Sequence, residues 1–143
     1  FGGMSASGYV GDSHPGQWMP FWQQACAADK RGACDNLMFL QDGFCQDGSG
    51  WACNEFGIQM ASREPSRQRA TMAFDRACAL RFPVGCDNAI AAAGAGSFRH
   101  EPPRTGDYPF ILRGSKGPIR EREPVALYAR ACSQGWPDTC GRQ

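Results

Sequence analysis

Apolar residues along much of the chain recur every three or four positions, the spacing that places them on one face of an α-helix. Two stretches carry this pattern most clearly, and their apolar residues are Leu37, Phe39, Leu40 and Phe44 within 33–46, and Met72, Ala73, Ala77 and Leu80 within 64–82. We expect the first set to cluster on one side of its helix and the second set to form a buried stripe. The whole pattern predicts an all-α chain with helices over residues 18–26, 33–46, 51–61, 64–82, 84–93 and 120–134, and a seventh beginning at Pro137.

Two stretches break the helical pattern. Residues 1–17 are rich in glycine and serine and have little to bury, which predicts a flexible leader. Residues 95–119 contain Pro102, Pro103 and Pro109 together with several glycines, so a regular helix is excluded there. The chain has 143 residues, enough for one core. We therefore predict one helical domain over 18–143, interrupted by an irregular proline-rich insertion at 95–119.

The cysteines show the most regular spacing in the chain. All eight fall into sequential pairs with seven residues between the members of each pair: Cys26 and Cys34, Cys45 and Cys53, Cys78 and Cys86, Cys132 and Cys140. Eight cysteines allow many connectivities, but a spacing that is repeated four times favours the sequential one. Glycine or proline between the members lets one helix end and the next begin, and a short helical hairpin brings such positions within disulfide distance.

A metal site is the alternative interpretation of these cysteines. Zinc ligands usually have only about two to four residues between neighbouring cysteines, and no histidine accompanies any of the four pairs. Cys-x-x-Cys redox and haem-attachment motifs are absent as well. We therefore expect structural disulfides, no metal and no cofactor. Disulfides persist in oxidising compartments, which predicts a periplasmic or otherwise extracytoplasmic protein.

Three segments share a longer layout, over residues 21–37, 74–89 and 128–140. The clearest reads Phe74-Asp-Arg-Ala-Cys-Ala-Leu-Arg-Phe-Pro-Val-Gly-Cys86-Asp-Asn-Ala. The layout resembles Sel1-like repeats, which are related to tetratricopeptide arrays, and more narrowly their cysteine-rich subgroup. The resemblance implies a short right-handed solenoid of antiparallel helix pairs, with one disulfide per pair, and a role in assembling or regulating protein complexes. The chain departs from the family pattern at its overlapping first hairpins, its insertion and its short last hairpin.

Charge and hydropathy limit the classes of partner. The formal net charge is only +1, which argues against nucleic-acid binding. Residues 1–60 carry a net charge of −4 and the remainder +5. Such a dipolar chain can orient against a charged partner, although a solvated helical surface explains the pattern equally well. No stretch approaches the roughly 18 apolar residues of a membrane helix. We expect membrane association to be indirect, or through a segment preceding Phe1.

Catalytic signatures are missing from the sequence. Ser-x-x-Lys and Lys-Thr-Gly, typical of penicillin-recognising enzymes, do not occur. The only histidines are His14 and His100, which we interpret as solvated and without a catalytic partner. The insertion holds a group of polar residues: Arg99, His100, Glu101, Arg104 and Asp107. We predict no catalytic residue and no enzyme. A secreted penicillin-binding or β-lactamase-like hydrolase and a haem-handling assembly factor remain as alternatives that rest on the family resemblance.

Protein binding is therefore the predicted class of function. The insertion carries apolar residues that resemble no repeat, followed by basic ones: Phe98, Tyr108, Phe110, Ile111, Leu112, Arg113, Lys116, Arg120 and Arg122. Aromatic residues and arginine are common anchors of interfaces. We predict that these residues contact a protein partner. The chain would then be an extracytoplasmic interaction module, or an accessory or scaffold subunit of a larger complex such as one in a membrane.

Overall fold

The structure is a computed structural model of the whole chain. It describes residues 23–28, 32–63, 68–94, 96–114, 117–118, 123–136 and 139–141, and for 113–114 and 117–118 only the backbone. The predicted leader over 1–17 and the predicted helix start at Pro137 lie outside these residues. So does most of the predicted helix 18–26, of which the structure describes a helical segment over 23–27.

Helices dominate the described residues, as the apolar pattern predicts. They are α2 (Ala33–Asp47), α3 (Gly50–Arg63), α4 (Gln68–Ala79), α5 (Pro83–Ala93), α6 (Tyr108–Ile111) and α7 (Pro124–Ser133), with the 3-10 turn η1 (Thr105–Asp107). One small exception lies inside the predicted insertion. There the two-residue strands β2 (Arg113–Gly114) and β3 (Gly117–Pro118) pair antiparallel. The insertion therefore holds short elements that the sequence pattern did not predict.

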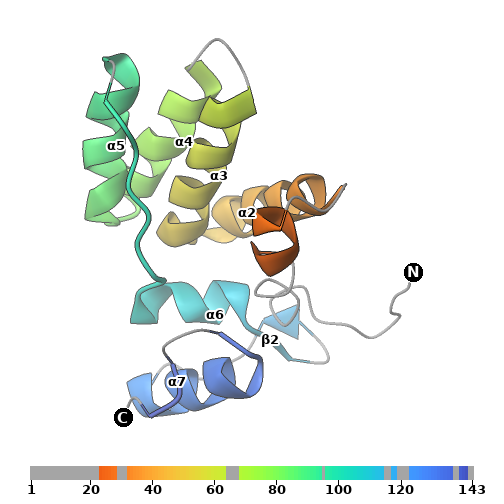
Figure 1. Cartoon of the computed structure of the whole chain (residues 1–143). Coiled ribbons are helices and arrows are strands. Elements are labelled where there is room, and N and C mark those ends of the chain that lie inside the picture. Colours follow the sequence, from red (N-terminus) through yellow and green to blue (C-terminus); the bar gives the residue numbers. More distant parts are fainter. Residues whose placement is uncertain are drawn as a thin grey trace. The chain divides into compact units, whose positions relative to one another are not determined.

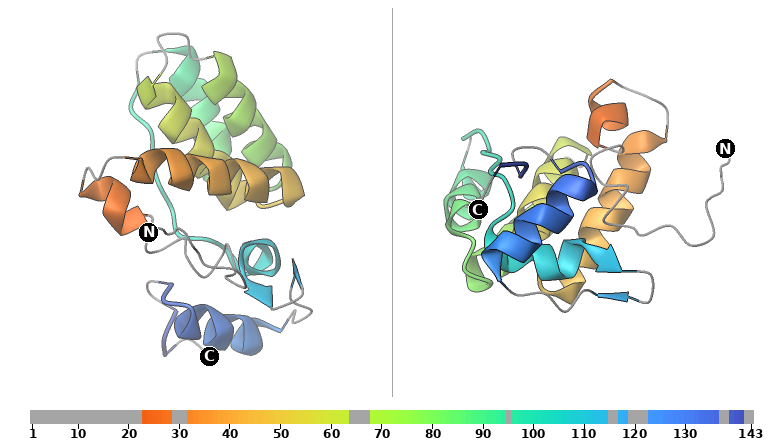
Figure 2. Two further views of the ribbon diagram at one scale, coloured as in Figure 1. Left: turned by 90° about the vertical axis from the view of Figure 1, so that its right-hand side faces the viewer. Right: turned by 90° about the horizontal axis from the view of Figure 1, so that it is seen from below.

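The chain forms two compact units. One spans residues 35–108, and the other takes the described residues before 35 and after 108. In the first unit, α3, α4 and α5 lie side by side, with α4 in contact with both neighbours (Figures 1 and 2). The buried apolar residues described in the second unit are Ala33, Ile111, Leu112, Leu127, Ala131 and Trp136.

The core of the first unit is built around Phe74, which is fully buried. Met60, Ala70 and Ala92 complete this cluster from α3, α4 and α5. The ring of Phe74 lies so close to the backbone of α3 that a Cβ atom on Gly57 would sit 2.6 Å from it. Glycine is thus required at position 57, because any side chain there would overlap the aromatic ring.

Three of the disulfides join the end of one helical segment to the beginning of the next, and the fourth joins the end of α7 to the turn at Cys140. The sequential pairing is confirmed, and the four bonds are Cys26–Cys34, Cys45–Cys53, Cys78–Cys86 and Cys132–Cys140. Their Cα–Cα distances are 4.6 to 4.8 Å. The separation of eight residues is short enough for the local turn alone to bring the two cysteines together.

Three of these turns share one backbone conformation. Three positions after the first cysteine stands a residue with positive φ, which is Gly48, Arg81 or Gly135. The next residue donates its backbone N–H to a carbonyl five positions back: Ser49 to Phe44, Phe82 to Ala77 and Trp136 to Ala131. This bond satisfies a carbonyl at the helix end that has no partner within the helix. The hairpins are therefore local repeats of one geometry.

Two residues of the stripe that we expected to be buried are exposed, Met72 by 64% and Leu80 by 37%. Phe39, from the other stretch, is 76% exposed. On α4 the buried residues are Ala70, Ala73, Phe74 and Ala77. Met72 lies on the opposite side of the helix, because Phe74 and the small alanines set the face that packs against the neighbouring helices.

Candidate functional site

After α5 the chain runs as an extended segment over residues 96–104, which we call the strap (Figure 1). Two asparagines hold it, Asn54 from α3 and Asn88 from α5. Their side chains are almost completely buried, with 0% and 1% of the residue exposed. We call this pair the asparagine clamp.

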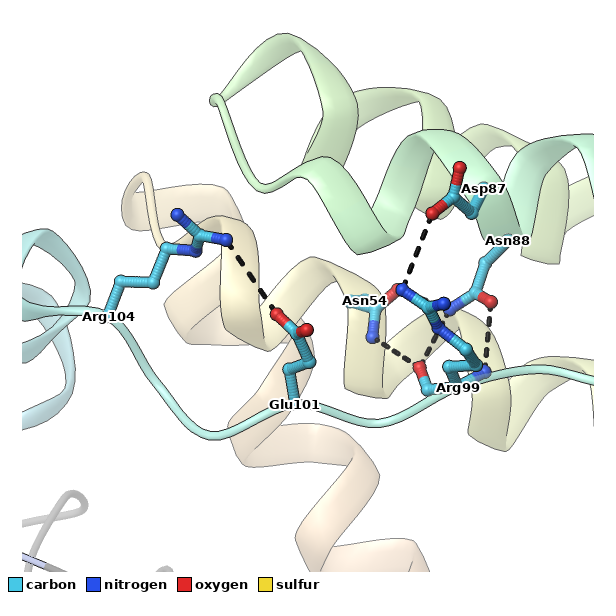
Figure 3. A network of polar contacts seen from close by, with 6 residues as sticks. All are labelled: Asn54, Asp87, Asn88, Arg99, Glu101 and Arg104. Carbon is cyan, nitrogen blue, oxygen red and sulfur yellow. Dashed lines mark hydrogen bonds and ion pairs between the residues drawn. The ribbon is translucent and has the colours of Figure 1, made fainter.

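The clamp binds the backbone of Arg99 on both sides (Figure 3). The amide of Asn88 donates to the Arg99 carbonyl at 2.9 Å, and its oxygen accepts the Arg99 N–H at 2.9 Å. Asn54 donates to the same carbonyl at 3.2 Å and accepts from Asn88 at 2.7 Å. These contacts involve only main-chain atoms of the strap. The clamp therefore recognises an extended backbone and not the arginine side chain.

His100, the next residue of the strap, is paired with a carboxylate. Its Nδ1 lies 2.9 Å from Oε2 of Glu55, a residue of α3 whose side chain is only 10% exposed. The hydrogen bond to Glu55 raises the pKa of His100 above 6.5, assisted by the charge of that carboxylate and opposed by partial burial of the ring. His100 is solvated, as we expected, with 65% of its side chain exposed, but the ion pair with Glu55 was not predicted. Sequence spacing gave no sign of the pair, since the two residues are 45 positions apart.

The remaining charges of the strap lie at the surface. Arg99 approaches Asp87 at 3.4 Å, and Arg104 approaches Glu101 at 3.7 Å (Figure 3). Exposed pairs of this kind add little stability, because water screens both charges. Phe98 attaches the strap to the helices through packing, because its ring lies on that of Phe74 with centroids 5.0 Å apart.

Asp107 anchors the far end of the strap to the start of α3. One carboxylate oxygen accepts the hydroxyl of Ser49 at 2.9 Å and the N–H of Trp51 at 3.0 Å. The other accepts the N–H of Arg104 at 2.8 Å. A carboxylate at this position satisfies backbone donors that the first helical turn leaves unpaired. The polar residues of the insertion thus attach the strap to the helices and do not converge on one centre.

The predicted partner contacts have three different outcomes. Tyr108, Ile111 and Leu112 are at most 2% exposed, so the chain itself covers them, and a contact with a partner stays a prediction. Phe98 and Phe110 are half-buried. The basic side chains of Arg113, Lys116, Arg120 and Arg122 lie outside what the structure describes, and their role stays a prediction.

A second surface feature was not predicted. An open groove of about 340 Å³ lies among α2, α3 and α4, and we call it the apolar groove. Its lining residues are Asp35, Met38, Phe39, Asp42, Phe56, Met60, Arg63 and Arg69. At one end Nη1 of Arg63 lies 2.6 Å from Oδ1 of Asp35. Phe39, the most exposed large apolar residue described, belongs to this lining.

Sequence reasoning missed the clamp and the groove for different reasons. The sequence contains a signal for the clamp, because Asn54 and Asn88 each stand one or two positions after the second cysteine of a disulfide pair. The groove had a weak signal, because Phe39 stands two positions after Leu37 and so lies off the helical face that Leu37, Leu40 and Phe44 share. Among the described residues, no group of candidate ligands could hold a metal ion, and no helix has the length and apolarity needed to cross a membrane.

Comparisons with known protein families, curated sequences and solved structures gave no match to this chain.

Proposed function

We propose that the chain is an extracytoplasmic protein-interaction module that catalyses no reaction and serves as an accessory or scaffold subunit of a larger complex. We further propose that its hairpins form a short Sel1-like right-handed solenoid. The four disulfides and the turn geometry that three hairpins share support both proposals. A periplasmic location fits the same disulfides, which are stable outside reducing compartments.

The apolar groove is the observation that carries the proposal. Fully burying a phenylalanine is worth about 1.5–3 kcal/mol, so the 76% exposure of Phe39 leaves much of that unrealised in the isolated chain. A single exposed apolar residue needs no explanation, but Phe39 lies beside Met38, Phe56 and Met60 in one groove. Methionine, phenylalanine and arginine are enriched at protein interfaces, and this groove contains all three.

The test compares the full chain with two variants. Phe39→Asp places a charge in the groove, whereas Ile90→Asp places one at a 75% exposed residue of α5 outside the groove lining. Each tagged protein is isolated from the extracytoplasmic fraction of the source cell, and its partners are identified by mass spectrometry. Binding is then measured with both purified components. We expect an equimolar partner with wild type and Ile90→Asp, weakened at least about tenfold by Phe39→Asp.

Two results would overturn the proposal. One is that no equimolar chain accompanies the wild type. The other is that Phe39→Asp and Ile90→Asp bind the purified partner equally well. Circular dichroism checks that both variants keep their helices, which we expect because both positions are exposed.

A further inference from the structure

We propose that the site under the strap is a binding site for an extended segment of another protein, and that the strap is its removable occupant. The segment carries an aromatic residue, then any residue except proline, then a histidine or another base. This inference goes beyond the proposed function, because the asparagine clamp and Glu55 are not among the described residues that line the apolar groove. The contacts of the strap, the way the site is built and the attachment of the strap carry it.

The asparagine clamp offers a complete set of partners for one residue of an extended main chain. Asn88 donates to Asn54 at 2.7 Å, and this bond lies within the clamp itself. The clamp then has two amide donors and one amide oxygen left, which bind the carbonyl and the N–H of Arg99 (Figure 3). Because no side chain of the strap takes part, any non-proline residue in the same conformation satisfies these bonds. An emptied clamp favours such a backbone, since buried amide groups without partners are costly.

The positions on either side of the clamp select side chains. One residue before Arg99, the ring of Phe98 lies on the fully buried Phe74, with centroids 5.0 Å apart. One residue after it, His100 lies 2.9 Å from a carboxylate oxygen of the mostly buried Glu55. A buried carboxylate needs a cation or a hydrogen-bond donor beside it. The site therefore favours an aromatic residue first and a base third.

The site is built without the help of the strap. Cys53 directly precedes Asn54, and Cys86 stands two residues before Asn88. The disulfides of these cysteines attach the starts of α3 and α5 to the helices before them, and α4 contacts both α3 and α5. The clamp thus keeps its geometry when the strap leaves, and a preorganised site loses less entropy on binding a segment.

The strap itself is attached only by contacts that can be exchanged. It contains no cysteine, so no disulfide holds it. Its ion pairs from Arg99 and Arg104 are exposed to water and contribute little. The main-chain bonds to the clamp, the ring of Phe98 and the pair of His100 with Glu55 are contacts that a second segment of the same pattern reproduces. The strap therefore acts as an autoinhibitory occupant of the site.

Another protein supplies this segment more readily than a second copy of the chain does. A short tether keeps the strap at an effective concentration of about millimolar beside its own clamp. Exchange between two copies requires both straps to detach, so the cost of detachment arises twice. A segment of another protein displaces one strap only. We therefore assign the occupant to another protein.

The first experiment uses a fluorescent peptide with the sequence of residues 96–104 and measures its binding to the full chain by anisotropy. The wild type should bind it weakly, because its own strap competes. Phe98→Ala weakens the strap and leaves the site intact, so it should bind the peptide at least about tenfold more tightly. His100→Ala loosens the strap on its other side and should act in the same direction. It takes the place of Phe98→Ala if circular dichroism shows that the latter loses its helices.

The second experiment changes the site within the Phe98→Ala chain. Asn88→Ala should weaken peptide binding at least about tenfold, because it removes two bonds to the main chain of the segment. Asn36→Ala is the matched control at an exposed asparagine of α2 and should leave binding unchanged. A peptide with alanine in place of its phenylalanine should bind at least about tenfold more weakly. Opposite effects of weakening the strap and weakening the clamp are expected only if the two compete for one site.

The inference is overturned if the peptide does not bind Phe98→Ala or His100→Ala at about millimolar concentration. It is also overturned if the wild type binds as tightly as these variants, or if Asn88→Ala and Asn36→Ala bind equally. Sedimentation of the purified wild type tests the assignment of the occupant. A dimer that Asn88→Ala abolishes would assign the segment to a second copy and overturn the proposal of another protein.

Failure of this inference and failure of the proposed function are distinguishable through Phe39→Asp. That variant alters the apolar groove and should bind the peptide as the wild type does. A chain that loses its partner with Phe39→Asp but never binds the peptide refutes the inference alone. A chain that binds the peptide through Asn88 but has no partner sensitive to Phe39→Asp refutes the proposed role of the groove alone.

Discussion

Replacing Asn88 with alanine should release the strap from the helices. The substitution removes three hydrogen bonds, two that join Asn88 to the backbone of Arg99 and one to Asn54. Each is worth about 1 kcal/mol net, so the full loss is about 3 kcal/mol. Because the strap can detach and its backbone can then bind water, part of this cost is recovered. We expect a fall of about 2–3 kcal/mol in the free energy needed to detach the strap from the helices.

Trypsin provides the assay, since Arg99 lies at the centre of the strap. Cleavage after Arg99 requires local opening, and its rate follows the population of the open form. A loss of 2–3 kcal/mol should therefore speed this cut by about 30- to 160-fold. Mass spectrometry identifies the cleaved bond, and urea unfolding followed by circular dichroism reports the stability of the whole chain.

The chain offers a matched control in Asn36. It stands two residues after Cys34, as Asn88 stands two residues after Cys86, but it is exposed on α2. Asn36→Ala should change stability by no more than about 0.5 kcal/mol and leave the cut after Arg99 unchanged. If Asn36→Ala and Asn88→Ala accelerate that cut equally, the clamp does not hold the strap and the reasoning is refuted.

Two further predictions concern the ion pair of His100 and the packing of Gly57 against Phe74. The raised pKa of His100 means that its pair with Glu55 contributes in full below pH 6.5 and is lost as pH rises through the folded-state pKa. In Glu55→Gln the pKa of His100, measured by NMR titration, should return toward 6.5. The difference in the free energy of unfolding between wild type and variant should be wider at about pH 5.5 than at about pH 8.5. An unchanged pKa of His100 would contradict the pair. Gly57→Ala should destabilise by about 1–3 kcal/mol, because its Cβ would overlap the Phe74 ring. Gly43→Ala, with no neighbour within 4 Å, should stabilise by about 0.5–1 kcal/mol in the same thermal unfolding series, and equal effects would contradict the packing argument.

Local features of this protein could be predicted from its sequence. The pairing of Cys45 with Cys53 depends on a separation of eight residues, over which one turn determines the geometry. The helices follow from apolar spacing, and α2 begins where that spacing predicts. Such features need no knowledge of the remaining chain, because each depends on atoms within about two helical turns.

Tertiary structure alone decided the candidate sites. Ser49 and Asp107 are 58 positions apart and Asn54 and Asn88 are 34 apart. Only the packing of α3, α4 and α5, and the return of the chain to the start of α3, bring these pairs together. Burial is decided in the same way. A helical stripe shows which residues share a face, but the neighbouring helices determine which face is covered. For that reason Met72, which belongs to the stripe of α4 that we expected to be buried, lies at the surface.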